Sequence, residues 1–283
     1  MDARGSSPEW EAADRAAAAA GVSLVPMETV EDALRVNRVI AQVWGEDELR
    51  PSLTRAFQHA GCGVYGSQDE HGALVGFVLG FLGWGGGLHM HSHMLAVLPS
   101  WQSKGVGYAL KLAQRAACLE AGVEEARWTY DPLVPRNAWF NLVKLGTVAT
   151  SFFPGFYGDM TDRINQGDRS DRFEVRWRLT SDRVARAVSS RAVEPTKGPV
   201  ILSCDGDADA PRPTETGVEP DPGAVIEVPA DHAALRARDP GLGREWRDAS
   251  ARAFRSCFAA GLVGAWIDRA GRYVFLPEDE VLS

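Results

Sequence analysis

Two glycines at the start of a helical pattern are the residues of this chain best suited to bind a phosphate group. Gly105 and Gly107 lie in the string QSKGVG, which joins a strand-like run to the helix-like run YALKLAQRAACLEAG. A glycine-bearing turn at a helix N-terminus presents backbone N–H groups and the positive end of the helix dipole to an anion. The pattern therefore predicts a phosphate-binding turn at residues 102–107.

The charges around this turn agree with an anionic ligand. The chain has a formal net charge of −8, yet it contains no Asp or Glu between His71 and Leu119. Lys104, Lys111 and Arg115 fall within the same stretch. An acidic protein that keeps carboxylates away from one glycine turn favours an anion there. The acidic balance also argues against nucleic acid as a partner, because such partners usually require a basic face.

Three glycine-turn patterns compete for this segment. The mononucleotide P-loop, with Gly-Lys-Ser/Thr after a first glycine and four residues, is absent from the chain. The dinucleotide fingerprint requires a third glycine where Leu110 stands, and a strand that enters the turn directly, whereas Pro99 interrupts it. The third pattern, Gln/Arg-x-x-Gly-x-Gly/Ala, matches residues 102–107.

Three histidines precede the turn. His89, His91 and His93 alternate along the strand-like run, so we expect them to share one face. Imidazole titrates near neutral pH and can act as a general base. The alternative is that these side chains hydrogen-bond within the sheet or face solvent. Three histidines also raise the question of zinc, but the third lies too far along the strand and no carboxylate is nearby, so we expect no metal.

The surrounding elements must position this turn and strand. A strand at 23–28 is followed by a helix that Thr29 caps with Asp32, and a second helix follows Pro51. The whole pattern predicts the order β-α-α-β-β-β-α-β-α-β-β, complete by about Leu179.

Composition changes divide the chain. We expect a disordered N-terminal segment at 1–22, with a frayed helix as the alternative, a main domain at 23–180, a flexible connection at 181–223, and a small α+β unit at 224–283 packed on the main domain. The last unit contains a helix capped by Asp231 and ends in a hairpin around 269–271. No apolar run is long enough to span a membrane, and the four cysteines form no C-x-x-C pair, so we expect a reducing cytoplasm and no membrane partner.

The turn, the strand ending LAVLP and the complete element order resemble the GNAT acyltransferase superfamily. The resemblance implies an α/β (α+β) fold with a mixed, mostly antiparallel central sheet flanked by helices, here with a small C-terminal α+β unit. The strings HSHM, WTYDPLVPRNAWFNLVKLG, FYGDMTDRINQGDRSDRFEVRW and EWR resemble a subgroup of predicted bacterial GNAT acyltransferases. Some of those relatives look like N-succinyl- or N-acyltransferases that act on amino acids.

The resemblance implies an acyl-CoA, acetyl-CoA or succinyl-CoA, as the co-substrate. The preceding strand would leave its neighbour and open a slot for the pantetheine arm. There Leu95 and Val97 would contact the coenzyme, and the Val97 N–H would polarise the thioester carbonyl. Asn137 and Asn141 would hydrogen-bond the pantetheine amides. The pyrophosphate would be wrapped by the six residues of the turn, Gln102, Ser103, Lys104, Gly105, Val106 and Gly107.

Two histidines and two tyrosines are the candidate catalytic residues. His91 lies eleven residues before Gln102, about where some protein-acetylating relatives carry a general-base glutamate, and His93 is a second candidate. Many members use a tyrosine to protonate the thiolate, but Leu142 occupies that place here. Tyr157 or Tyr130 could substitute for it, or water could suffice.

The acceptor is expected to be a small amine, with an amino acid as one example. The carboxylate of such an acceptor needs a cation, and the polar segment 152–172 offers Arg163, Asn165, Arg169 and Arg172. The alternative is that this segment is a solvated loop. Two other functions stay open, a protein N-acetyltransferase and a non-catalytic acyl-CoA-binding module, and a homodimer is also left open.

Overall fold

The computed structural model of the chain describes residues 7–45, 49–61, 63–158, 167–196, 198–207 and 209–282. Two units can be distinguished: residues up to Trp128 form the first, and the described residues from Thr129 on form the second. Both units are built from strands flanked by helices, and most strand pairs are antiparallel. The predicted fold class is confirmed.

The first unit contains a sheet with the strand order β1-β2-β3-β4-β5. The first three strand pairs are antiparallel, and β4 and β5 are parallel. Its helices and strands are α1 (Pro8–Ala19), β1 (Ser23–Pro26), α2 (Val30–Val43), α3 (Pro51–His59), β2 (Val64–Gln68), β3 (Leu74–Gly83), β4 (His89–Val97), α4 (Val106–Glu120) and β5 (Glu125–Tyr130).

Helix α2 begins where the sequence predicts it. The Thr29 hydroxyl accepts a hydrogen bond from the Asp32 backbone N–H, and the Asp32 carboxylate accepts one from the Thr29 N–H, both over 3.1 Å. This reciprocal capping box satisfies N–H groups that the first helical turn leaves without partners, which typically stabilises a helix by about 1 kcal/mol. The buried face of α2 packs through Ile40 against Phe77 and Leu79 of β3. One face of the sheet is thereby covered.

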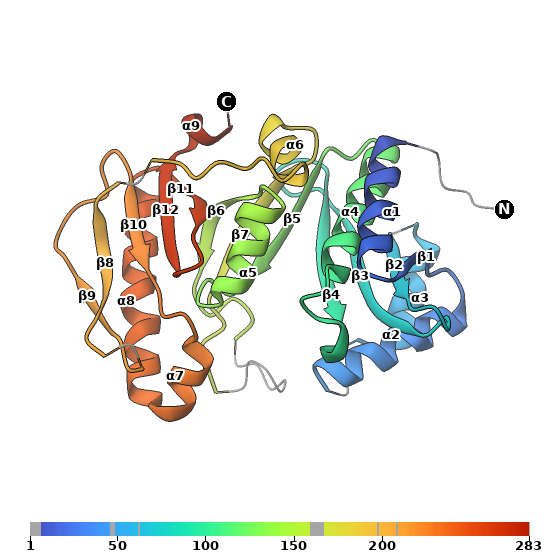
Figure 1. Ribbon diagram of the computed structural model, residues 1–283, viewed down its shortest axis with the longest axis horizontal. Helices are drawn as coiled ribbons and strands as arrows, with labels where there is room; N and C mark the ends of the chain where they lie inside the picture. The colour runs from blue at the N-terminus through green and yellow to red at the C-terminus, as the bar shows by residue number, and fades with distance from the viewer. Residues whose placement is uncertain are drawn as a thin grey trace. The chain divides into compact units, whose positions relative to one another are not determined.

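Helix α4 covers the opposite face of the sheet, and α1 packs on α4. Ala109, Leu110 and Ala113 of α4 are fully buried. Helices α1 and α4 lie side by side (Figure 1), and the Trp10 indole N–H donates to the Glu120 carboxylate over 3.1 Å. The expectation of disorder over 1–22 therefore fails for residues 8–19, because this alanine-rich helix buries Trp10 and its small residues in the first unit.

The second unit has the strand order β7-β6-β11-β12-β10-β8-β9. Its helices and strands are α5 (Pro135–Trp139), a π-helical turn (Phe140–Lys144), β6 (Val148–Phe153), β7 (Arg172–Arg178), α6 (Asp182–Val188), β8 (Val200–Asp205), β9 (Arg212–Glu215), β10 (Ala224–Glu227), α7 (His232–Arg238), α8 (Pro240–Ala259), β11 (Leu262–Ile267), β12 (Arg272–Pro277) and α9 (Glu278–Leu282).

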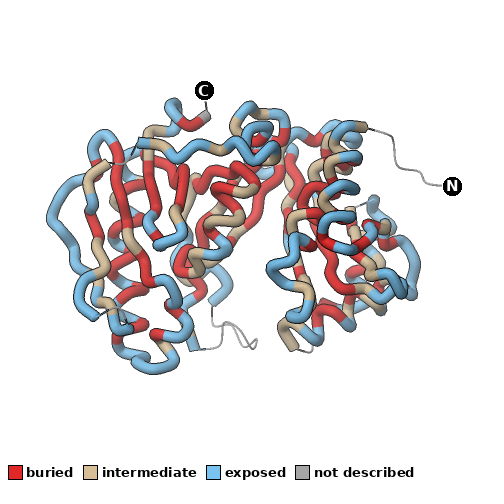
Figure 2. Tube along the Cα trace, in the orientation of Figure 1, coloured by how far each residue is buried: buried red, intermediate tan, exposed pale blue. Residues whose placement is uncertain are grey.

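An aromatic cluster forms the core of the second unit. Phe173 of β7 lies 4.6 Å from Phe254 of α8, measured between ring centroids, and 5.7 Å from Tyr273 of β12. Edge-to-face contacts of this kind add to the free energy gained by burial. In Figure 2 the buried positions follow the strands and the sheet-facing side of α8. The long late helix and the hairpin β11–β12 agree with the predicted elements.

The arrangement of the C-terminal half differs from the expected one. The segment 181–223, expected as a flexible connection, contains α6, β8 and β9. Residues 224–283 do not form a separate small unit, because Gly264 of β11 pairs with Ala149 of β6 and continues the sheet that β6 and β7 begin. The backbone groups on that edge of β6 find their partners in a strand more than a hundred residues later.

Candidate functional site

The glycine turn connects β4 to α4 as predicted. After β4 the chain passes through a short 3-10 turn at Pro99–Trp101 and reaches α4 at Val106. Gly105 is the residue before the helix and has φ +94°, a left-handed conformation that favours glycine. Ser103 also has a positive φ, of 62°. The backbone therefore bends twice within three residues and directs successive N–H groups outward.

The N–H groups of this turn have no acceptor in the protein. Among the residues that the structure describes, no backbone carbonyl or side chain accepts a hydrogen bond from the backbone N–H of residues 103–107. The turn residues 102–105 are exposed, and a Cβ placed on Gly105 would contact only Ala20, at 3.6 Å. Because the first turn of α4 carries no acidic side chain, the helix N-terminus stays electropositive and open to an anion.

A side-chain hydrogen bond connects the turn to the end of β4. The Gln102 side-chain amide donates to the Val97 carbonyl over 3.1 Å. The Leu98 N–H donates to the Val75 carbonyl of β3 over 2.9 Å. Because backbone groups alternate in direction along a strand, the Val97 N–H points to the opposite edge of β4. This is the edge that faces β5.

Strands β4 and β5 pair over only a short length. Met90 pairs with Ala126 and His91 with Arg127, and the ladder does not continue among the described residues. By contrast, β4 stays paired with β3 to Val97. The β5-facing edge of β4 from residue 92 to Val97 is therefore released from the parallel ladder, within the first unit.

A β-bulge changes the face of β4 that α4 covers. Leu79 pairs with Met94 and Gly80 with Ser92, so His93 is the extra residue. Ser92 contacts α4 on one side of the bulge, and Leu95 and Val97 contact it on the other: a Cβ on Gly107 would lie 3.7 Å from both. The bulge is what allows Leu95 and Val97 to lie beside the glycine turn.

His91 and His93 lie together on the other face of β4. Their ring centroids are 6.1 Å apart, and the Phe81 ring lies 5.0 Å from His91 and 5.8 Å from His93. The His89 side chain instead contacts the backbone, with its Nδ1 2.8 Å from the Gly87 carbonyl oxygen. Burial, together with the positive charges that His93, His89 and Lys111 would add, lowers the pKa of His91 to about 4. His91 is therefore a neutral imidazole at pH 7.

The sequence did not reveal where the Lys111 side chain lies. Its ammonium is buried and donates to the Ser92 hydroxyl over 2.9 Å and to the Gln114 amide oxygen over 2.8 Å. Nζ also lies 3.5 Å from the centroid of the Trp128 ring. Burial lowers the pKa of Lys111 to about 7. Instead of adding charge to the glycine turn, this lysine joins β4, β5 and α4 where the β4–β5 ladder ends.

Of the three basic residues in the acid-free stretch, Lys104 is the one at the turn. It is exposed, and its Nζ lies 5.0 Å from the Trp101 ring centroid. Arg115 is partly buried on α4, where burial lowers its pKa and the Glu9 carboxylate opposes that shift. The electropositive character of the turn thus rests on Lys104 and the backbone.

Asn137, Asn141 and Tyr157 belong to the second unit. Asn137 is exposed at the start of α5, whereas Asn141 is buried. The π-helical turn from Phe140 breaks the α-helical spacing that would place both side chains on one face. Tyr157 is exposed, and its hydroxyl lies 3.3 Å from the Thr129 hydroxyl. Tyr130 is buried, which raises the pKa of its phenol, and Leu142 is buried as well.

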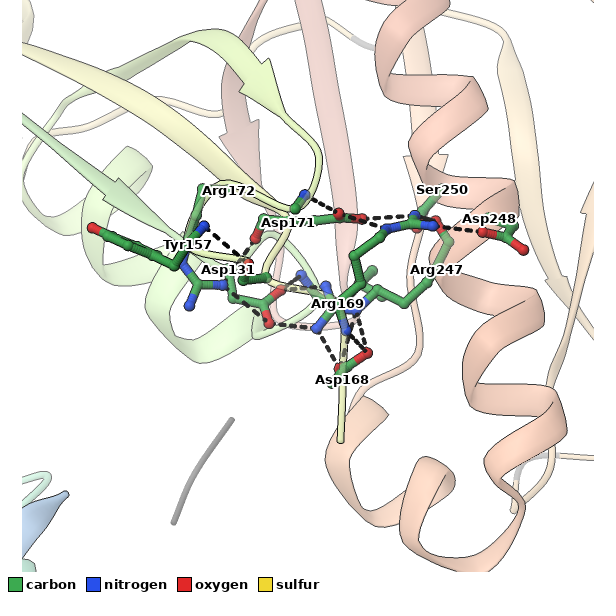
Figure 3. Close-up of polar contacts among 12 residues, drawn as sticks. Asp131, Tyr157, Asp168, Arg169, Asp171, Arg172, Arg247, Asp248 and Ser250 are labelled. Carbon is green, nitrogen blue, oxygen red and sulfur yellow. Dashed lines mark hydrogen bonds and ion pairs between the residues drawn. The ribbon is translucent and has the colours of Figure 1, made fainter. Parts of the chain in front are cut away.

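An ion-pair network occupies the second unit where substrate-binding arginines were expected. Arg247 of α8 binds Asp131 and Asp168 with both sides of its guanidinium, at 2.5 to 3.1 Å (Figure 3). Arg169 binds Asp171 and Asp248, and Arg172 donates to the Asp171 carbonyl. Arg163 and Asn165 lie outside the described residues. Three of the four strings that suggested a subgroup, those around Asp131, Asp168 and Arg247, therefore meet in one network.

Metal-binding groups and long apolar helices are both absent from the part of the chain that the structure describes. In that part of the chain, no group of three or more His, Cys, Asp and Glu side chains is placed to hold a metal ion. No helix of the described ranges is long and apolar enough to cross a membrane.

A protein-family model matches part of the chain. Residues 28–137 match the model of the acetyltransferase (GNAT) family. This range includes β4, the glycine turn and α4. No curated protein sequence matches the chain.

Solved acetyltransferase structures are similar at low sequence identity. The ribosomal-protein-S18-alanine N-acetyltransferase from Escherichia coli is 14% identical, with a TM-score of 0.46, over 56% of this chain and 95% of that one. A GNAT superfamily phosphinothricin acetyltransferase from Sinorhizobium meliloti, in complex with AcCoA, is also 14% identical, with a TM-score of 0.45, over 55% of this chain and 87% of that one.

Proposed function

Because residues 28–137 of this chain match the acetyltransferase (GNAT) family model, we propose that the protein is an acyl-CoA-dependent N-acyltransferase. The proposed acceptor is the amine of a small molecule, with an amino acid as one candidate, and the proposed donor is acetyl-CoA or succinyl-CoA. The observation that carries the proposal is the row of backbone N–H groups at residues 103–107, which have no acceptor among the described residues and lie beside the released edge of β4.

The turn supplies the binding interactions. A pyrophosphate carries several acceptor oxygens, and N–H groups at a helix N-terminus satisfy them without a counter-ion. Gln102 holds the turn against Val97, so the phosphate site and the end of β4 form one rigid piece. The pantetheine arm would then follow the edge of β4 that β5 leaves free.

The chemistry requires one bond to form and one to break. The deprotonated acceptor nitrogen attacks the thioester carbonyl, the C–S bond breaks, and the proton lost by the amine balances the one gained by the departing thiolate. The Val97 N–H, on the free edge of β4, would stabilise the oxyanion of the tetrahedral intermediate. His91 is neutral at pH 7 and would accept the amine proton, directly or through water.

The mechanism needs a general acid, or water, to protonate the departing thiolate. Leu142 stands where many relatives carry a tyrosine, and it is buried. Tyr157 is the exposed phenol that we propose in its place, with water as the alternative. The same observation favours a second candidate function, a domain that binds acyl-CoA and has lost the transfer reaction.

The location of the reaction is proposed to be the cytoplasm. The three cysteines that the structure describes, Cys118, Cys204 and Cys257, are free thiols. Free thiols are typical of a reducing compartment.

The test is to incubate the full chain with acetyl-CoA and succinyl-CoA and a panel of amines that includes amino acids and peptides with free N-termini. We expect release of the coenzyme thiol that depends on the amine, and a product whose mass equals amine plus acyl group. Turnover with peptides alone would favour a protein N-acetyltransferase. Tight coenzyme binding without thiol release for any amine would favour the binding module and contradict the enzyme.

A further inference from the structure

A small cavity in the second unit is lined by more arginine than aspartate side chains. It has a volume of about 340 Å³ and lies where α7, the first turns of α8 and residues 167–169 meet. Four arginines line it, Arg169, Arg236, Arg244 and Arg247, together with two aspartates, Asp168 and Asp248. Cavities that bind small molecules have volumes of this order or somewhat larger.

Two of the arginines already have their full set of partners. The Arg247 guanidinium uses one edge for Asp131 and the other for Asp168. Arg169 binds Asp171 with Nε and Nη2, Asp248 with Nη1, and the Arg247 carbonyl with Nη2. These two residues form the rigid wall of the cavity, and their charges are balanced by carboxylates.

The other two arginines have donors to spare. Arg236 Nη1 is buried and lies 3.0 Å from an Asp168 oxygen, yet it donates no hydrogen bond among the described residues. Arg244 is exposed, and in the described part of the chain no carboxylate forms an ion pair with it. A buried N–H donor without an acceptor costs free energy, so an acceptor from outside the chain would be stabilised there.

Gly243 brings the two arginines onto adjacent surfaces. A Cβ on Gly243 would lie 2.8 Å from Cβ and Cγ of Arg236, so α8 approaches α7 this closely only because that residue is glycine. His232 of α7 holds the same junction, with its Nε2 3.0 Å from the Gly243 carbonyl. Arg244 directly follows Gly243. Two guanidinium groups are therefore held on the two helices that border one cavity.

We propose that this cavity is a binding site for a small oxyanion, a carboxylate or phosphate group, held by Arg236 and Arg244. The planar guanidinium fork matches both groups with paired hydrogen bonds, and the Arg244 charge, which no described carboxylate balances, adds electrostatic attraction beside the Asp168-paired Arg236. Arg169 and Arg247 are held in place by their ion pairs, so the wall of the cavity loses little conformational entropy when an anion binds. The site lies wholly in the second unit, and the proposal holds whether or not the first unit transfers an acyl group.

The test is calorimetric titration of the full chain with inorganic phosphate and, separately, with succinate. We expect saturable binding of at least one of them, with Kd on the order of 1 mM or below, weakened by added salt. The anion that binds more tightly identifies the carboxylate or phosphate class. Absence of saturable binding for both anions at about ten times that concentration would overturn the proposal.

Matched variants locate the binding. Arg244→Ala removes an exposed side chain, so the fold is retained, and we expect affinity to fall about tenfold or more, the loss typical of one charge-assisted contact. Arg236→Lys keeps the charge but not the fork, and should also weaken binding. Arg255→Ala is the control, since Arg255 is exposed on the same helix α8 and lies outside the cavity. Equal affinity in Arg244→Ala, Arg236→Lys and Arg255→Ala would place the anion elsewhere and refute the site.

Discussion

The Lys111 ammonium lies 3.5 Å from the centroid of the Trp128 ring, which joins α4 to β5 at the point where β5 leaves β4. The same nitrogen donates to Ser92 of β4. One buried cation thus contacts both strands of the parallel ladder just beyond its last pair, His91 with Arg127. The separation of the two strands is therefore supported by a specific side chain, which adds to the proposal that this edge receives a coenzyme.

Replacing this cation should change how stability depends on pH. Burial lowers the pKa of Lys111 to about 7 in the folded chain, whereas an unfolded lysine titrates near 10.4. Between these values the unfolded chain binds more protons, so the free energy of unfolding rises with pH, by at most about 1.4 kcal/mol per pH unit. Urea unfolding at pH 7 to 10 should show this rise in the wild type and its loss in Lys111→Met. Parallel curves for the two proteins would contradict a buried, titrating lysine.

Gly105→Ala should weaken coenzyme binding without unfolding the protein. The new methyl group meets only Ala20 at 3.6 Å, but it would stand in the space assigned to the pyrophosphate. The left-handed φ costs about 1 kcal/mol of stability. We expect the Kd for acetyl-CoA, measured by calorimetry, to rise about tenfold or more.

Gly122→Ala is the matched control for this change. Gly122 follows the other end of α4, has φ +72°, and has nothing within 4 Å of an added Cβ. It should lose a similar amount of stability and keep the wild-type affinity. If both variants bind the coenzyme equally well, the glycine turn is not the phosphate site.

His91→Ala should lower turnover by about a hundredfold if the imidazole accepts the amine proton. The KM for the coenzyme should change little, because His91 lies on the face of β4 opposite the glycine turn. Since the pKa of His91 is about 4, its protonation should not change the reaction rate between about pH 5 and pH 8. His71→Ala, at an exposed turn position, serves as the control. Unchanged turnover in His91→Ala would remove this residue from the mechanism.

Arg247→Met should destabilise the second unit strongly. It would leave the Asp131 and Asp168 carboxylates without their shared partner, and breaking such a buried pair typically costs about 3 to 5 kcal/mol. Arg252→Met, on the same helix, breaks only an exposed pair with Glu215 and should cost less than about 1 kcal/mol. Thermal unfolding of both variants measures the difference. If the melting temperatures of both variants fall by similar amounts, the network contributes no more stability than an exposed ion pair does.

The pH dependence of this network has a defined sign. Burial would raise the pKa of Asp168, but the Arg247 hydrogen bonds and charge lower it more, and the pKa of the folded chain lies below the usual value of 3.8. A carboxyl whose folded pKa is lowered stabilises the fold above its unfolded pKa and loses that contribution as the pH falls. The stability difference between wild type and Arg247→Met should therefore narrow below about pH 4.

The sequence predicted those features whose conformation depends on residues close together in the chain. Thr29 and Asp32 cap α2, Gly105 takes the left-handed conformation before α4, and the C-terminal hairpin turns at 269–271, because each depends on residues within one turn of the chain. The position of the glycine turn between β4 and α4 could be predicted for the same reason. The sequence left residues 8–19 open between disorder and a frayed helix, because an alanine-rich segment carries little periodicity and its order comes from packing on α4.

Long-range partners could not be predicted. Lys111 looked like a phosphate-turn cation, and nothing local shows that Ser92 and Trp128 bury its ammonium. Asp131, Asp168 and Arg247 come from segments up to 116 residues apart, and a single sequence does not show which charges meet. The bulge at His93, which sets the face that Leu95 and Val97 present, also depends on its pairing with β3 and has no signal in β4 alone.

The claim on which this account depends is that the backbone N–H groups of residues 103–107 bind the coenzyme diphosphate. Amide NMR of the labelled chain, titrated with coenzyme A, tests it most directly. We expect the signals of Ser103 to Gly107 to shift in a saturable way while the Gly122 signal stays in place. If those five signals do not move as the coenzyme is added, or if the shifting amides all lie outside the turn, the proposed site is wrong.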